Sequence, residues 1–168
     1  LGGLGSSLHL AGEQLKMMSG IRLLNVPYKG TTPAMTDVLA GHVDLMFISM
    51  VTGSAQVRAG KLKAFGVTSA ARQPSFPDLP AIGEVVPGFE STAWFGVLAP
   101  ANLPAPIATK LNSVIAASLA GPRLKQQLLL EGATPVGNSL AEFSAFVRGD
   151  VQRWAPIVKQ SGATPEGG

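Results

Sequence analysis

The chain has 168 residues, of which 46% are hydrophobic and 14% are charged, and its net charge is only +3. This composition predicts a packed core rather than disorder, and the absence of a basic run with interleaved aromatic residues argues against nucleic acid as a partner. Cysteine is absent, which excludes disulfides, thiolate nucleophiles and cysteine-based zinc sites.

The apolar stretches of the chain are all shorter than the 18 residues that a membrane-spanning helix requires. The sequence begins at Leu1 without an initiator methionine, and no signal peptide follows. We therefore interpret the chain as a mature form or a fragment of a longer protein, and the absence of a signal peptide here gives no information about localisation.

The first half of the chain alternates between helical and strand-like patterns. Apolar residues at helical spacing predict a helix over residues 7–19, with Ser6 or Ser7 as its N-cap and Gly20 as its stop. Two further helices are predicted over residues 33–40 and 54–59. Short apolar runs predict strands over residues 23–26, 43–47 and 61–68. This alternation predicts an α/β layer with a mainly parallel sheet.

The second half of the chain is organised differently. Four prolines and two glycines between residues 70 and 90 forbid long regular elements, so this stretch is interpreted as a connecting segment. An apolar run predicts one more strand at residues 94–98, and the remainder is helical. Pro122 begins one helix, and Ser139 with Glu142 forms a capping box for the last one. An apolar stripe predicts another helix through Ile107, Leu111, Val114, Ile115 and Leu119.

Two of the predicted helix starts carry hydroxyl side chains beside glycine. The first is the glycine-rich run that ends in Ser6 and Ser7, with His9 in the first helical turn. The second is Val-Pro-Tyr-Lys-Gly-Thr-Thr-Pro at residues 26–33, in which Thr32 is the predicted N-cap. Free N–H groups at a helix start favour a bound anion, so the two loops predict a shared carboxylate or phosphate site. The alternative is that both are ordinary capped turns.

A series of short motifs follows in order along the chain. It includes Gly-Ser-Ser-x-His at 5–9, Val-Pro-Tyr-Lys-Gly at 26–30 and Asp-Val-Leu-Ala-Gly-His-Val-Asp-Leu-Met-Phe at 37–47. Further motifs lie at residues 58–68, 77–84, 94–100 and 153–156. In this order they resemble the Bug-type receptors, the substrate-binding proteins of tripartite tricarboxylate transporters, and the resemblance covers essentially the whole chain.

The resemblance implies a periplasmic, two-lobed α/β receptor with the type II fold of periplasmic binding proteins. Such a receptor closes on a small carboxylic acid and delivers it to the subunits of a tripartite tricarboxylate-type membrane transporter. Residues 1–90 would form most of the second lobe, without its opening strand, and residues 91–168 the mostly helical C-terminal part of the first. Together, the loops and the resemblance give the ligand-binding residues Ser6, Ser7, His9, Tyr28, Gly30, Thr31 and Thr32.

Two departures from the family pattern carry further expectations. The family has roughly another lobe's length before the position of Leu1, so this chain would hold half of the binding site. We expect such a truncated chain to dimerise or to swap domains, because it would expose strand edges. In addition, Ile48 stands where many relatives carry a polar or acidic residue. A carboxylic acid without an ammonium group is therefore the expected ligand.

The sequence also bears on functions other than that of a transport receptor. An enzyme could use Ser6 or Ser7 as a nucleophile, but no Gly-x-Ser-x-Gly elbow is present and no spacing indicates a catalytic triad. A sensory role, in which the closed receptor docks on a signalling partner, stays open. No cofactor is expected, and no metal site is expected, because the sequence lacks closely spaced histidines and dense carboxylates.

Overall fold

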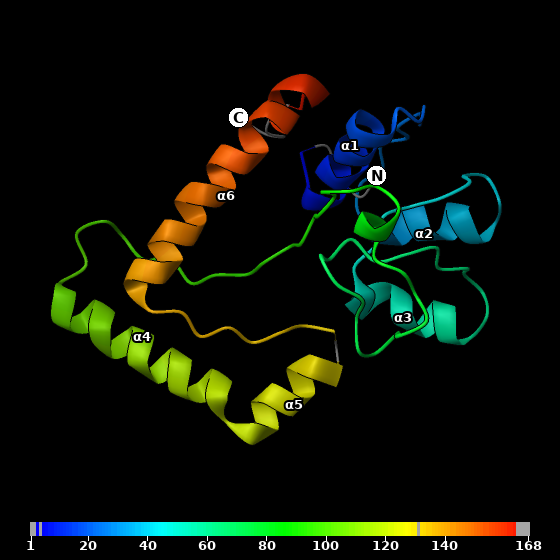
Figure 1. Ribbon diagram of the computed structural model, residues 1–168. Coiled ribbons are helices and arrows are strands. Elements are labelled where there is room, and N and C mark those ends of the chain that lie inside the picture. The colour runs from blue at the N-terminus through cyan, green and yellow to red at the C-terminus, as the bar shows by residue number, and fades with distance from the viewer. Residues whose placement is uncertain (1–2, 4, 131, 164–168) are drawn as a thin grey trace. The chain divides into compact units, whose positions relative to one another are not determined.

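The computed structural model describes residues 3, 5–130 and 132–163. Within these residues the regular elements are all helices (Figure 1), and none of the helices is long and apolar enough to cross a membrane. They are α1 (Ser7–Ser19), α2 (Thr31–Leu39), α3 (Met50–Arg58), the 3-10 helix η1 (Ile82–Glu84), α4 (Ala105–Ala120), α5 (Pro122–Leu130) and α6 (Leu140–Ser161).

The chain divides into two compact units. The first unit comprises Leu1–Ala93 together with Ala155–Gly168, and the second comprises Trp94–Trp154. The first unit therefore contains α1, α2, α3, η1 and the last residues of α6, and the second contains α4, α5 and most of α6. The assignment of residues 1–90 and 91–168 to two receptor lobes stays a prediction.

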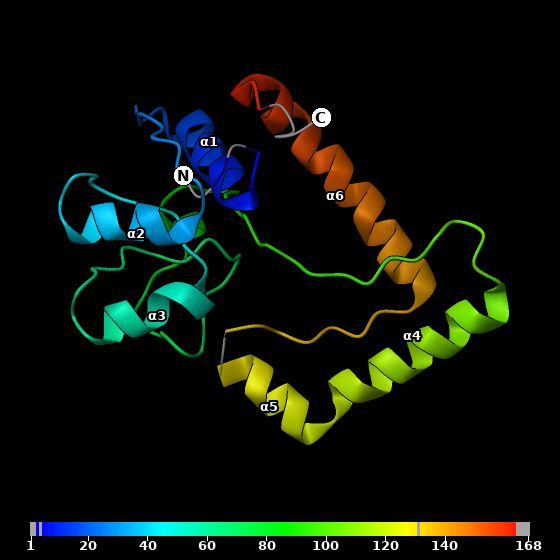
Figure 2. The ribbon, with the colours of Figure 1, turned by 180° about the vertical axis from the view of Figure 1, so that it is seen from behind.

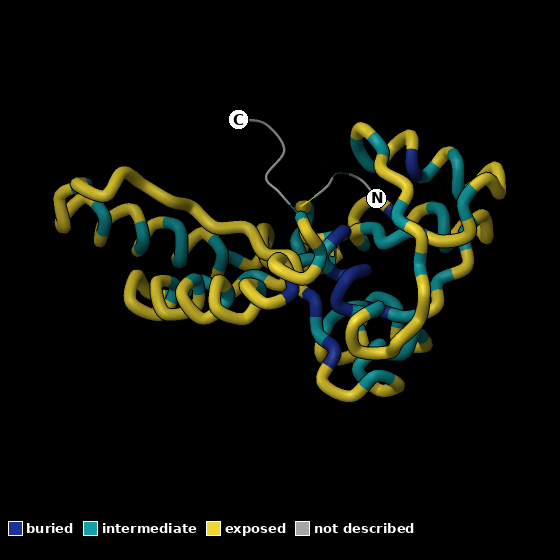
Figure 3. Tube along the Cα trace, turned by 90° about the horizontal axis from the view of Figure 1, so that it is seen from above, coloured by how far each residue is buried: buried dark blue, intermediate teal, exposed yellow. Residues whose placement is uncertain are grey.

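The hydrophobic core lies in the first unit. Val67 and Ala81 form an isolated parallel bridge, in which the Val67 N–H donates to the Pro80 carbonyl and the Ile82 N–H to the Val67 carbonyl, both at 2.9 Å. Most of the chain is coloured as exposed or intermediate, with buried positions in dark blue (Figure 3). The buried hydrophobic residues are Ala11, Ala34, Val67, Ala81, Phe89 and Ile157.

The second unit has no buried residue among its described positions. It contains an aromatic cluster, in which the Trp94 ring meets Phe143 and Phe146 edge-to-face at centroid distances of 5.7 and 5.4 Å. The Trp94 indole N–H also donates to Asp150 Oδ2 at 2.7 Å. The apolar stripe predicted for α4 is only partly covered, since Ile107, Leu111 and Val114 are about half exposed.

Most of the predicted helices are confirmed. They were predictable because the residues that begin and end each helix lie close to it in the sequence. α1 begins after Ser6, whose side chain accepts the His9 N–H, and it ends at Gly20, whose left-handed φ of 72° glycine adopts without strain. The capping box before α6 is also present: the Ser139 N–H donates to Glu142 Oε2 at 2.8 Å, and the Glu142 N–H donates to Ser139 Oγ at 3.3 Å.

The N-cap predicted for α2 was wrong. Gly30, with φ 110° and ψ 174°, precedes the helix, so Thr31 and Thr32 lie inside the first turn and Thr32 is not the cap. Pro33 is accordingly the third helical residue, where its missing N–H leaves no helical hydrogen bond unmade. α3 also begins four residues earlier than predicted, at Met50, because Ser49 caps it by accepting the Thr52 N–H.

The four predicted strands were wrong for the described residues. No β-ladder forms at any of the predicted positions, which are residues 23–26, 43–47, 61–68 and 94–98. Val67, in the third of these ranges, makes only the isolated bridge to Ala81. Figure 2 shows the stretch before α4 as a long coil without an arrow. A strand is stable only when a neighbouring strand satisfies its backbone groups, and these segments find no such neighbour among the described residues. Large apolar side chains on them stay exposed, including Leu24, Leu45, Phe65 and Phe95.

Candidate functional site

The loop before α1 is held by its own side chains. Ser6 accepts the His9 N–H at 3.3 Å, and its hydroxyl donates to the Gly3 carbonyl at 2.8 Å. Ser7 is the first residue of α1, is exposed, and its hydroxyl has no hydrogen-bond partner among the described residues. Of the two serines, therefore, Ser7 has a hydroxyl that is still available as a donor.

The imidazole of His9 is buried, with 2% of the residue exposed. Its Nδ1 accepts the Gly5 N–H at 3.0 Å, and this bond places the ring proton on Nε2. Nε2 faces Glu13 Oε1 at 3.6 Å and Asn25 Nδ2 at 3.5 Å. Both ring nitrogens thus face groups of the protein, and this geometry argues against a direct ligand contact for His9.

Glu13 joins α1 to the segment that follows it. Lys16 Nζ donates to Glu13 Oε1 at 2.7 Å, and Asn25 Nδ2 donates to the same oxygen at 2.5 Å. Burial raises the pKa of the Glu13 carboxyl, but the hydrogen bonds from Lys16 and Asn25 outweigh burial and lower the pKa overall. Since Asn25 lies three residues before Tyr28, these contacts hold the approach to the second loop against α1.

Tyr28 in the second loop is tied to α2. Its hydroxyl donates to Asp37 Oδ2 at 2.6 Å, and Asp37 Oδ1 lies 3.5 Å from His42 Nδ1. The hydrogen bond to Asp37 raises the pKa of Tyr28, and the same bond, followed by that of His42, lowers the pKa of Asp37. The Tyr28 hydroxyl is therefore used as a donor within the protein and retains only lone pairs for other contacts.

α2 begins without a side-chain cap. Gly30 has no side chain to accept the N–H groups of the first turn, and no other residue makes a capping hydrogen bond there. The hydroxyls of Thr31 and Thr32 have no hydrogen-bond partner in the described part of the chain. The start of α2 thus combines unsatisfied backbone donors with two free hydroxyls, the arrangement that favours an anion.

Sequence reasoning found the two loops but not the residues that connect them. Free hydroxyls remain on Ser7, Thr31 and Thr32. In contrast, the hydroxyls of Ser6 and Tyr28 and the ring nitrogens of His9 contact other groups of the protein. The connecting residues are Glu13, Asn25 and Asp37. Glu13 and Asn25 stand in no recognisable motif, and Asp37 begins the motif at 37–47, which does not indicate its partner. Each acts through a contact with a residue distant in sequence. A pairing of this kind leaves no periodic signal, so no sequence pattern could have revealed it.

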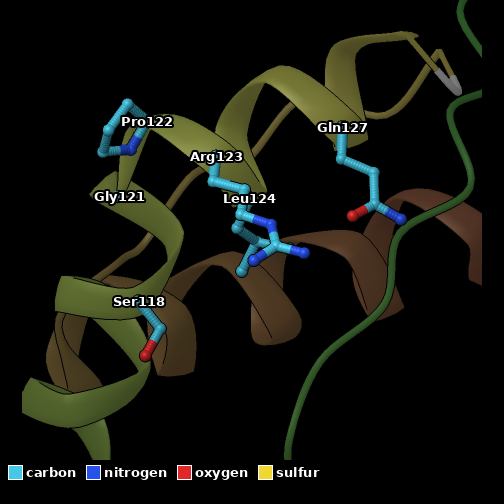
Figure 4. A pocket seen from close by; sticks show the side chains of 6 residues that line it. All are labelled: Ser118, Gly121, Pro122, Arg123, Leu124 and Gln127. Atoms are coloured by element: carbon cyan, nitrogen blue, oxygen red, sulfur yellow. The ribbon is translucent and has the colours of Figure 1, made fainter.

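A separate cavity of about 440 Å³ lies in the second unit, where α4 meets α5. Figure 4 shows Arg123 and Gln127 extending from α5, and Ser118 from α4. The lining residues are Ser118, Gly121, Pro122, Arg123, Leu124 and Gln127, and none of them is a predicted ligand-binding residue. Among the described residues no group of three histidine, aspartate or glutamate side chains could hold a metal ion.

A family model described as "Tripartite tricarboxylate transporter family receptor" matches residues 2–163. The chain belongs to this family. A protein from the tcbD-tcbE intergenic region of Pseudomonas sp. strain P51 is 35% identical over 158 residues, which are 93% of this chain and 47% of that protein. Protein BugT of Bordetella pertussis is 33% identical over 97% of this chain and 50% of its own length. The chain thus spans about half the length of both relatives, and its membership confirms the predicted resemblance.

Solved structures of similar proteins support the predicted fold. R. palustris Rpa4515 with adipate has 36% sequence identity and a TM-score of 0.87, covering 98% of this chain and 56% of that one. The periplasmic binding protein BugD has 38% identity and a TM-score of 0.80, covering 95% and 54%. MatC from Rhodopseudomonas palustris with bound malate has 30% identity and a TM-score of 0.79, covering 92% and 54%. These likenesses are consistent with part of a two-lobed periplasmic-binding-protein fold.

The family and its solved members are solute-binding proteins rather than enzymes. The alternative in which Ser6 or Ser7 is a nucleophile therefore has no support from the relatives.

Proposed function

We propose that this chain is the part of an extracytoplasmic receptor that holds the carboxylate of a small organic acid between the starts of α1 and α2. The observation that carries the proposal is the set of free donors at these two starts. Ser7, Thr31 and Thr32 have unpaired hydroxyls in the first helical turns, and α2 has no side-chain cap. Donors of this kind, at helix N-termini, suit a carboxylate ligand.

The charge around the loops suits an anionic ligand. The buried Glu13 carboxylate is paired with Lys16 at 2.7 Å, so that it adds little net negative charge to the first unit. Lys29 is exposed next to the second loop. The ligands named in the structures of two relatives, adipate and malate, are small dicarboxylates and support this ligand class.

A receptor of this family would release its ligand to a membrane transporter, and we propose that role and a periplasmic location for this protein. The supporting observations are the family description and the periplasmic binding protein among the structural relatives. The mechanism would be closure of two lobes around the acid, each contributing donors to it. A role in sensing is the alternative, and capture of a signalling protein only in the presence of ligand would favour it.

The proposal is tested by titrating the chain with adipate and with malate while following its backbone amide signals by NMR. The amides of Gly5–Ser7 and of Thr31–Thr32 should shift in saturable fashion. The isolated chain should bind weakly, because a carboxylate held by one unit stays partly in water, and calorimetry on a receptor of full family length should give tight binding. Absence of any shift in these amides, together with tight binding at other residues, would place the ligand elsewhere.

A matched pair of double variants sharpens the test. Ser7→Ala with Thr31→Val removes two free hydroxyls and should weaken binding roughly tenfold or more, about 1.4 kcal/mol. The control is Ser19→Ala with Thr36→Val, because these hydroxyls donate to the Leu15 and Thr32 carbonyls within their own helices. Equal binding by both double variants would contradict a role for the helix-start hydroxyls.

The absence of an ammonium group from the ligand is a further part of the proposal. Ile48 is half-buried and offers no polar atom to such a group. Aspartate differs from malate in carrying an ammonium group in place of the hydroxyl, so aspartate should bind more weakly than malate in the same titration. Preference for aspartate would overturn this part and leave the carboxylate site intact.

We also propose that the isolated chain self-associates through its unpaired extended segments. Phe95 is fully exposed, and Val97 and Leu98 are 71% and 76% exposed, on a stretch with no ladder partner among the described residues. Such segments pair readily with other chains. Light scattering should report a dimer or a larger species, and a stable monomer would contradict the proposal.

A further inference from the structure

One carboxylate oxygen in the first unit contacts two residues that adjoin the candidate loops, His9 after the first loop and Asn25 before the second. Glu13 Oε1 accepts from Asn25 Nδ2, lies 3.6 Å from the Nε2 of His9, and accepts from Lys16 at 2.7 Å. The Glu13 side chain is only 10% exposed. A buried carboxylate is expensive unless its oxygens are satisfied, so its position between these donors is strongly determined.

The contacts continue from this oxygen to the first loop. Because Nδ1 of His9 accepts the Gly5 N–H at 3.0 Å, the ring proton sits on Nε2 and points toward Glu13. The carboxylate thereby favours the tautomer and the ring orientation that hold Gly5. Gly5 is two residues before Ser7, whose hydroxyl is one of the proposed ligand donors.

The contacts also continue to the second loop. Asn25 is separated from Glu13 by 12 positions, and its amide is the contact that holds the segment after α1 against that helix. This segment leads directly to Tyr28 and then to Gly30, where α2 begins. Displacement of Asn25 would therefore move the approach to the uncapped start of α2.

We propose that Glu13 is a positioning residue for the carboxylate site, fixing the Gly5–Ser7 loop through His9 and the Tyr28–Thr32 loop through Asn25. The inference rests on the proposed function, but it concerns the link between the loops and not the ligand itself. Glu13 does not touch the acid. It sets the spacing of the two groups of donors, and a carboxylate that bridges them depends on this spacing.

The first test needs no ligand. In Glu13→Gln, hydrogen exchange of the Gly5 amide should accelerate roughly tenfold or more, and the backbone amide signals of Asn25 and Tyr28 should shift, since both loops lose their common anchor. The amide of Phe89, in the core of the same unit, should change little. Ring ¹⁵N signals should show an unprotonated Nδ1 for His9 in the wild type and a mixture of tautomers in the variant.

The matched control is Glu84→Gln in the same unit. Glu84 accepts two hydrogen bonds from Arg72 and one from the Ala81 N–H, and it contacts neither loop in the described residues. This variant removes a comparable set of bonds, so a general loss of stability would appear in both variants. Changes in Gly5 exchange and in the Asn25 and Tyr28 amide signals that are as large in Glu84→Gln as in Glu13→Gln would overturn the proposal.

A second variant covers the case in which Glu13→Gln does not fold. Asn25→Ala removes one link and leaves the contacts of Glu13 with His9 and Lys16 in place. The backbone amide signals of Tyr28, Thr31 and Thr32 should shift while Gly5 stays protected from exchange. An unchanged second loop, or equal loosening of Gly5, would contradict the inference.

Titration with adipate and malate then separates this inference from the proposed function. If the wild-type chain shifts at neither loop with either acid, the carboxylate site fails, and the exchange and amide-signal data still decide whether Glu13 couples the loops. If the wild type binds, Glu13→Gln and Asn25→Ala should both weaken binding roughly fivefold or more, and Glu84→Gln should not. Unaltered binding in both loop variants would refute a positioning role.

Discussion

The Tyr28 hydroxyl donates to the Asp37 carboxylate at 2.6 Å. This bond raises the pKa of Tyr28 and lowers the pKa of Asp37. Loss of the tyrosine proton would leave two negative charges facing each other, which explains the direction of both shifts. The pair connects the loop before α2 to the second turn of that helix.

This pair gives a prediction that one absorbance titration can check, because Tyr28 is the only tyrosine in the chain. Asp37→Asn should bring the pKa of Tyr28 down toward the ordinary value, since the neutral amide no longer disfavours tyrosinate. His42→Ala is the control, because it leaves the Tyr28–Asp37 bond in place. A pKa of Tyr28 that is the same in Asp37→Asn and in the wild type would contradict the hydrogen bond between Tyr28 and Asp37.

A second prediction concerns acid stability. The Arg72 guanidinium, together with the Ala81 N–H, lowers the pKa of Glu84 to about 2 from 4.5. Because the folded pKa lies below the unfolded one, Glu84 contributes stability above pH 4.5, and this contribution disappears as the pH falls through about 2. Arg72→Met should therefore lower the free energy of unfolding near neutral pH more than near pH 2, as measured by urea denaturation.

The control for this experiment is Arg58→Met. Arg58 lies over the Phe76 ring at 5.1 Å and has no contact with Glu84 in the described residues. Its replacement should lower stability by a similar amount at both pH values. A pH-independent effect of Arg72→Met would show that the Glu84 contact contributes nothing through its charge.

A third prediction uses two glycines of the second unit. A Cβ on Gly96 would collide with the Phe143 ring and crowd the Trp94 ring, whereas a Cβ on Gly149 in α6 would meet nothing within 4 Å. Gly96→Ala should disrupt the aromatic cluster and alter the tryptophan fluorescence. Gly149→Ala should stabilise α6 by about 1 kcal/mol, because alanine loses less backbone entropy than glycine in a helix. Thermal unfolding of both variants provides the measurement.

A fourth prediction compares two hydroxyl residues at helix starts. Ser139 accepts the Glu142 N–H and is a true N-cap, so Ser139→Ala should cost about 1 kcal/mol of stability. Thr32 lies inside α2 and caps nothing, so Thr32→Ala should change stability by less than about 0.5 kcal/mol. Urea denaturation of the two variants provides the measurement. A larger loss of stability in Thr32→Ala than in Ser139→Ala would show that the cap of α2 was assigned wrongly.

The helices were predictable because their signals lie within a few residues of one another. Ser6 and Gly20 define α1 at both ends, and the Ser139–Glu142 box defines the start of α6. The start of α2 was misplaced because two local signals compete there. Gly30 adopts a φ of 110° that favours glycine, and the helix begins directly after it, so that Thr32 lies inside the first turn instead of capping it.

The strands and the coupling of the loops were not predictable in the same way. A run such as residues 94–98 has strand composition, but a strand forms only where a partner supplies its ladder, and this depends on distant chain. Likewise, the Asn25–Glu13 contact and the Tyr28–Asp37 bond join positions 12 and 9 residues apart. The free hydroxyls of Ser7 and Thr31 could be foreseen as candidate donors, whereas the residues that position them could not.

The absence of any buried residue among the described positions of Trp94–Trp154 affects how this unit should unfold. Heat capacity and denaturant sensitivity both grow with the apolar surface that unfolding newly exposes. A unit whose apolar side chains already contact water has little such surface left to expose. Its melting should therefore be broad, with a small heat-capacity step and a shallow urea dependence, whereas the first unit, built around Phe89, should account for most of the cooperative transition.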